Sequence, residues 1–143
     1  MSRPQVVIDT NVLIAALRSR HGASALLLSM LGDGSFEAHL SIPLALEYEE
    51  VLLRQRVELD LTTDEVDELV NSLCAVSVRH ETIYFSWRPS LADRRDEHIL
   101  DLAVKARCDA IVTFNVRNFA GAGQFGIRVI PPQTFLREIG AIR

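Results

Sequence analysis

Three acidic positions in the sequence could together bind a metal ion. Asp9 ends an apolar, β-branched run, Glu47 lies in a segment with helical spacing, and Asp96 begins another. Inward-facing carboxylates are costly to bury and repel one another unless a cation joins them. Oxygen ligands of this kind suit Mg²⁺ or Mn²⁺, which support phosphodiester hydrolysis. The pattern therefore favours a metal-dependent hydrolase.

Each of these residues also has a structural interpretation. Asp9 could cap a helix that starts directly after it. Helical periodicity does not choose between Glu47 and Glu49 as the inward carboxylate. Asp96 could simply interact with the positive end of a helix dipole. The histidines have no metal-binding spacing and are interpreted as surface or structural residues: His21, His39, His80 and His98.

The segments that must position these residues alternate between short apolar strands and helices. We expect strands at residues 5–9, 36–41, 76–78, 110–113 and 128–130. We expect helices at residues 12–17, 23–31, 43–52, 66–73, 93–107 and 132–139. Such alternation requires right-handed crossovers and predicts an α/β fold with a parallel sheet covered on both faces.

Size and composition predict one ordinary globular domain over residues 1–143. The net charge of −4 argues against a general nucleic-acid coat protein. Cys74 and Cys108 are far apart and form neither a disulfide nor a zinc pattern. No apolar run reaches the roughly 18 residues of a membrane span, and no signal sequence is evident. We therefore expect a cytoplasmic protein without a membrane anchor.

Four motifs, in this order, resemble the PIN-domain family. They are VVIDTNVLI at 6–14, EYEEVL at 47–52, DRRDEHILDLA at 93–103 and IVTFNVRNF at 111–119. The likeness extends to GIRVIPPQTFL at 126–136, so it covers nearly the whole chain. It looks closest to the bacterial branch of VapC-like toxin components of toxin–antitoxin systems.

The resemblance implies a three-layer α/β/α sandwich with parallel strand order 3-2-1-4-5. It implies a Mg²⁺- or Mn²⁺-dependent endonuclease that cleaves single-stranded RNA or structured RNA. Asp9, Glu47 and Asp96 would match three acidic catalytic positions of the family. Asn115 stands where many members have a fourth aspartate, and Asp93 would then be a substitute metal ligand.

Other residues near these motifs would support the acidic ones. By resemblance, Thr10, Asn11 and Thr113 would hold the carboxylates and waters in place. An anionic centre repels RNA, so we expect Arg95 and Arg117 to contact phosphates. The resemblance also implies a small antitoxin partner and a homodimer.

Three alternatives remain open. A catalytically weak PIN domain could serve as an RNA-binding or protein-interaction module, which the neutral Asn115 favours. A nuclease of this fold could instead act on flapped or structured nucleic acid. A response-regulator-like domain is disfavoured, because it needs a lysine after its last strand and Lys105, the lone lysine, lies in an expected helix.

Overall fold

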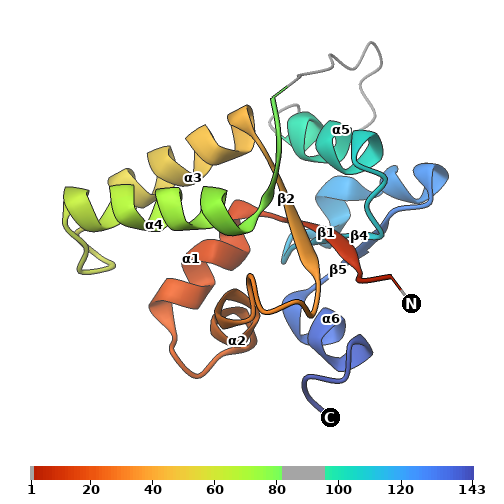
Figure 1. Cartoon of the computed structure of the whole chain (residues 1–143), viewed down its shortest axis with the longest axis horizontal. Helices are drawn as coiled ribbons and strands as arrows, with labels where there is room; N and C mark the ends of the chain where they lie inside the picture. The colour runs from red at the N-terminus through yellow and green to blue at the C-terminus, as the bar shows by residue number, and fades with distance from the viewer. Residues whose placement is uncertain (1, 82–95) are drawn as a thin grey trace.

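One parallel sheet of five strands forms the centre of the computed structural model, which describes residues 2–81 and 96–143. The strands, in chain order, are β1 (Gln5–Ile8), β2 (Glu37–Ser41), β3 (Val78–His80), β4 (Ala110–Val112) and β5 (Arg128–Ile130). They lie side by side in the order β3-β2-β1-β4-β5, and every neighbouring pair is parallel (Figure 1). The predicted fold class and strand order are confirmed.

Helices cover both faces of this sheet. The α-helices of the described residues are α1 (Thr10–Arg18), α2 (Ala23–Ser29), α3 (Ile42–Gln55), α4 (Thr63–Val76), α5 (Glu97–Lys105) and α6 (Pro132–Glu138). Two 3₁₀ helices, η2 (Val116–Phe119) and η3 (Ala122–Phe125), lie between β4 and β5. Helices α3, α4 and α5 pack over one face, and α2 and α6 lie across the other (Figure 1).

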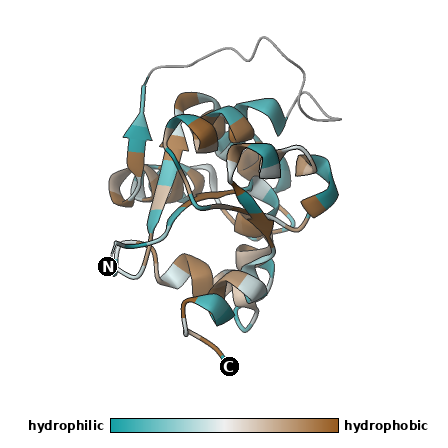
Figure 2. Ribbon diagram, turned by 90° about the vertical axis from the view of Figure 1, so that its right-hand side faces the viewer, coloured by the Kyte–Doolittle hydropathy of each residue, from teal (hydrophilic) through white to brown (hydrophobic). Residues whose placement is uncertain are grey.

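The central strands β1 and β4 are mainly apolar because both of their faces are buried. Val7 and Ile111 enter the core beneath α3, α4 and α5, whereas Val6, Ile8 and Val112 enter the core beneath α2 and α6. None of these five side chains is more than 4% exposed. In Figure 2, hydrophobic residues (brown) accordingly recur along the strands and on the helices that cover them. This is the pattern of a parallel sheet between two helical layers.

Strands β1 and β2 are followed at once by helices, and a capping residue marks each of these two transitions. Asp9 ends β1 and accepts a hydrogen bond from the Thr10 backbone N–H at 2.8 Å. Ser41 ends β2 and caps α3 by accepting from the Leu44 N–H at 3.2 Å. Such caps satisfy backbone donors that a helix leaves unpaired. The carboxyl edge of the sheet therefore gathers helix N-termini and the polar residues that cap them.

The expected strand at residues 76–78 is wrong in position. Helix α4 continues through Val76, and β3 begins only at Val78. The apolar face of α4 runs through Val66, Val70 and Leu73, so apolar residues just beyond them did not signal the helix end. Because β3 is a partly exposed edge strand, it also lacks the apolar pattern of a buried one.

The expected helix at residues 93–107 is seen from Glu97 to Lys105, and residues 93–95 lie outside the described residues. The last helix begins at Pro132 and the chain turns after it at Gly140, whose φ of +80° favours glycine. None of the helices in the described ranges is both long and apolar enough to cross a membrane.

Candidate functional site

Asp9 lies at the carboxyl end of the central strand β1 and is only 6% exposed. Its Oδ1 accepts from the Thr10 backbone N–H at 2.8 Å, and its Oδ2 accepts from the Thr113 hydroxyl at 2.7 Å. The Asn11 side-chain amide lies 3.3 Å from the same Oδ2. The three residues predicted to support the carboxylates thus all contact Asp9.

The surroundings of Asp9 raise the pKa of its carboxyl above the ordinary value. Burial is the largest cause, and the negative charge of Glu47 acts in the same direction. The hydrogen bonds from Thr113 and Thr10 and the nearby His98 favour the charged form and only partly offset this effect. A cation next to Asp9 would therefore stabilise the ionised carboxylate.

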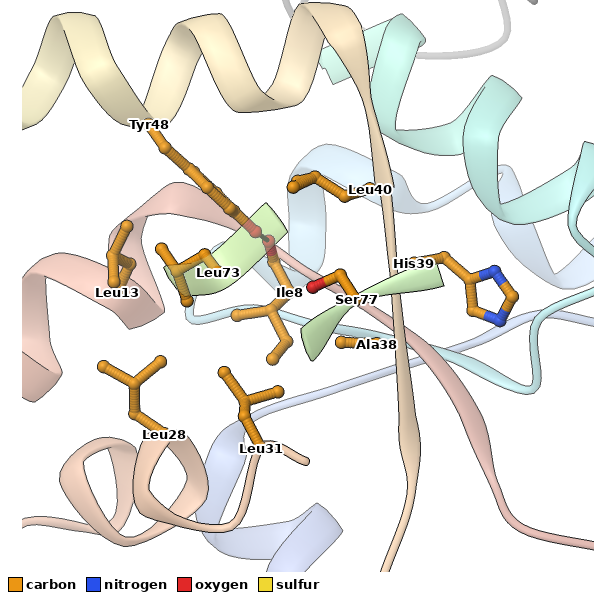
Figure 3. Close-up of a pocket in the computed structure, with 10 residues that line it drawn as sticks. All are labelled: Ile8, Leu13, Leu28, Leu31, Ala38, His39, Leu40, Tyr48, Leu73 and Ser77. Atoms are coloured by element: carbon orange, nitrogen blue, oxygen red, sulfur yellow. Dashed lines mark hydrogen bonds between the residues drawn. The ribbon is translucent and has the colours of Figure 1, made fainter. Parts of the chain in front are cut away.

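Tyr48 fixes the helix that carries Glu47 against the end of β1. Its buried hydroxyl donates a hydrogen bond to the carbonyl oxygen of Ile8. In Figure 3 the Tyr48 ring points from α3 toward Ile8, among apolar side chains that line a small pocket. Burial raises the pKa of Tyr48 well above its usual range, and the charges of Asp9 and Glu47 add to the effect. The hydroxyl thus stays protonated and keeps its role as donor.

Glu47 lies one residue before Tyr48 and is brought next to Asp9. The Thr10 hydroxyl donates to Glu47 Oε2, so one threonine contacts Asp9 through its backbone and Glu47 through its side chain. The side chain of Glu47 is 27% exposed. The structure thus shows that Glu47 is the carboxylate that shares Thr10 with Asp9. Helical periodicity alone could not choose between Glu47 and Glu49.

His98 is a neighbour of Glu47 that the sequence analysis missed. Its Nε2 lies 3.2 Å from Glu47 Oε1. An ionised carboxylate only accepts hydrogen bonds, so the proton of this contact lies on Nε2. The Nδ1 of His98 is buried and has no hydrogen-bond partner among the described residues. A usable signal was the four-residue spacing between His98 and the buried Leu102, which places both on one face of α5.

Asp96 lies at the start of α5 but does not cap the helix through its side chain. Its Oδ2 instead accepts from the Asn118 side-chain amide of η2 at 3.3 Å. Sequence reasoning also missed Asn118. The other two candidates of this segment, Asp93 and Arg95, lie outside the described residues.

The segment after β4 supplies the remaining candidates. Thr113 is fully buried, and its hydroxyl oxygen accepts from the Asn115 backbone N–H at 2.9 Å. Asn115 and Arg117 are both exposed to solvent. They are therefore accessible to a large ligand. The backbone N–H of Asn115 is held by Thr113, which in turn contacts Asp9.

The side chains that the fold brings together are of the type that binds a hard divalent cation. Asp9 and Glu47 contribute carboxylate oxygens, which Mg²⁺ and Mn²⁺ prefer. Within residues 2–81 and 96–143, however, no three His, Cys, Asp or Glu side chains are grouped to hold a metal ion. Asp9 and Glu47 share Thr10, whereas Asp96 contacts Asn118. The site as described holds two adjacent carboxylates, with a third at the start of α5.

Comparison with known families agrees with this geometry. The model of the PIN domain family matches residues 5–117. The matched span runs from β1 past β4 and contains Asp9, Glu47, Asp96 and Asn115. A comparison with curated protein sequences gave no significant match. PIN domains are generally nucleases, so the fold is of the nuclease type.

Proposed function

We propose that this chain, which belongs to the PIN-domain family, is a Mg²⁺- or Mn²⁺-dependent ribonuclease that cleaves RNA internally. The observation that carries the proposal is the buried Asp9 carboxylate beside Glu47 at the carboxyl edge of the sheet. In open parallel sheets, this edge is where ligands bind. Two neighbouring carboxylates in a partly desolvated position repel each other, and a divalent cation removes that repulsion.

The proposed metal ligands are Asp9, Glu47 and Asp96, with Asp93 as a further candidate. A bound Mg²⁺ or Mn²⁺ ion supplies an activated water and stabilises the leaving oxygen of a phosphodiester. Asn115, the fourth catalytic candidate, would contribute a side-chain carbonyl oxygen or orient water.

The remaining residues keep these ligands in position. Thr10, Asn11 and Thr113 hold the Asp9 carboxylate in one orientation. Thr10 also contacts Glu47. We propose that Arg95 and Arg117 bind RNA phosphates, since guanidinium groups suit phosphate geometry and offset the acidic centre.

Cleavage of a mixed RNA pool by the purified protein, with and without Mn²⁺, tests the proposal. We expect Mn²⁺-dependent cleavage that Asp9→Asn abolishes while the thermal unfolding curve stays cooperative. Asp67→Asn is the matched control, because Asp67 is an exposed carboxylate on α4. Mn²⁺ binding by calorimetry gives a readout that does not depend on activity. Wild-type protein that cleaves nothing in Mn²⁺ or Mg²⁺ would contradict the proposal.

We further propose that the protein is a single cytoplasmic domain over residues 1–143 that acts as the toxin of a type II toxin–antitoxin pair. The support is the likeness of the four motifs to VapC-like toxins. A small antitoxin protein and a homodimer belong to this proposal. Induced expression should arrest growth, Asp9→Asn should relieve the arrest, and a small gene next to this one should restore growth when co-expressed. Growth unaffected by the wild-type chain would oppose the toxin role.

The second candidate function is an RNA-binding or protein-interaction module with weak catalysis. The neutral Asn115 at the position of a fourth acidic residue favours it. Protein that binds both Mn²⁺ and RNA yet leaves the RNA intact would select this candidate over the nuclease.

A further inference from the structure

Phe114 exposes an aromatic ring directly beside the candidate site. Phe114 is 52% exposed, whereas Phe36, Phe119 and Phe135 are at most 3% exposed. Phe114 follows Thr113, whose hydroxyl binds Asp9, and precedes Asn115. A phenylalanine ring in water forgoes the stabilisation that burial gives it. Phe114 is joined in sequence to a residue that binds Asp9, so its exposed side chain is open to a ligand of this site.

The backbone that carries the ring is held on both sides. The Phe114 N–H donates to the Asn11 side-chain oxygen at 3.3 Å, and the Asn115 N–H donates to Thr113 Oγ1 at 2.9 Å. Asn11 and Thr113 in turn contact the Asp9 carboxylate. The attachment point of the ring is therefore fixed relative to Asp9. A rigid aromatic side chain on a fixed backbone loses little conformational freedom when it binds.

We propose that Phe114 stacks on an unpaired base next to the cleaved phosphodiester and thereby selects single-stranded RNA. The proposal rests on the nuclease function proposed above. Every base offers a flat face to an aromatic ring, so stacking tolerates any sequence. In a duplex both faces of each base are already covered by neighbouring bases, so a ring on the protein finds no free face. Arg117, exposed three residues later, is the residue proposed above to bind the phosphates of the same strand.

Equilibrium binding in EDTA tests the proposal without cleavage. The probes are an oligouridine that carries one 2-aminopurine and the same strand paired with a complementary strand. We expect Phe114→Leu to weaken single-strand binding about 5- to 100-fold, the range that loss of one stacked base produces. Duplex binding should change little. Phe114→Trp should retain single-strand binding and quench the 2-aminopurine fluorescence, because it preserves an aromatic face.

Phe125→Leu is the matched control, because Phe125 is also an exposed phenylalanine, at 47%, but lies in η3. It should bind both probes like the wild type. Equal single-strand affinity of Phe114→Leu and wild type would overturn the stacking role and leave the nuclease proposal standing. An equal loss for both probes would overturn strand selection. Wild-type protein that binds neither probe and cleaves no RNA would overturn the nuclease proposal as well.

Discussion

At the scale of residues, one threonine and one histidine contact the two carboxylate oxygens of Glu47 and orient them beside Asp9. Thr10 donates its hydroxyl to Glu47 Oε2, and His98 Nε2 approaches Glu47 Oε1. Each oxygen of Glu47 therefore has its own neighbour. Groups that orient metal-binding carboxylates in this way commonly change metal affinity about 10- to 100-fold when they are removed.

His98→Leu tests this orientation of Glu47. Leucine preserves apolar contacts but removes the donor, so Glu47 should lose its fixed orientation. We expect Mn²⁺ affinity to fall about 10- to 100-fold. His98→Gln, which can still donate to the carboxylate, should restore much of that affinity, and a purely structural role for His98 does not predict this rescue. Calorimetric titration with Mn²⁺ measures both variants, and unchanged affinity in His98→Leu would contradict the role.

The sequence predicted that Asp9 ends a strand, but it did not indicate that His98 contacts Glu47. Asp9 ends a short β-branched apolar run, which is typical of a buried strand, so its place at the sheet edge could be predicted from local pattern. His98 becomes a neighbour of Glu47 only because α3 and α5 pack over the same face of the sheet. The spacing of His98 and Leu102 indicates that His98 shares a face of α5 with a buried residue, but it does not indicate which residue of α3 this face meets.

At the scale of elements, the starts of α2 and α6 were predicted at Ala23 and Pro132, where the structure has them, whereas the boundary between α4 and β3 was misplaced. Starts have a local chemical signal, as Thr62 shows: its hydroxyl accepts from the Glu65 N–H at 3.1 Å, while the Glu65 carboxylate accepts from the Thr62 N–H at 3.0 Å. The end of α4 has no such signal, because apolar residues continue from the helix into Val76 and Val78. The sequence therefore placed the strand two residues too early.

Thr62→Ala should destabilise the protein by removing one half of this reciprocal cap. Loss of such an N-cap costs about 1 kcal/mol, within a range of about 0.5–2 kcal/mol. Thr63→Ala is the matched control, because Thr63 is the exposed first residue of α4 rather than its cap. Urea denaturation measures both free energies of unfolding. Equal values for the two variants would show that the cap adds nothing to stability.

At the scale of the whole molecule, a pair of histidines joins the edge strand β3 to the rest of the sheet. His39 of β2 and His80 of β3 lie with Nδ1 and Nε2 2.8 Å apart, and His39 Nε2 lies 2.5 Å from Gln5 Oε1. Strand β3 has only three residues, is partly exposed and pairs with β2 alone, so the histidine contact adds a side-chain link to the backbone pairing. This link crosses β1, β2 and β3 on the side of the sheet away from β4 and β5.

We expect this histidine pair to make the stability of the protein depend on pH. Burial is the main cause that lowers the pKa of both His39 and His80, and each also has a neighbouring positive group that acts in the same direction. For His39 that group is His80, and for His80 it is Lys105; Glu37 opposes the effect at His39. Since the unfolded chain binds protons more readily near the ordinary histidine pKa of about 6.5, acid favours unfolding.

We therefore expect the free energy of unfolding to be highest above about pH 6.5 and to fall as the pH drops below that value toward the lowered pKa values. His39→Gln should flatten this dependence, because glutamine can keep a hydrogen bond but does not titrate. His21→Gln is the matched control, since His21 is an exposed histidine. Urea denaturation between pH 5 and 8 measures the slope, in a range where carboxyl groups with ordinary pKa values stay ionised. A wild-type slope in His39→Gln would show that the acid sensitivity comes from groups other than this histidine pair.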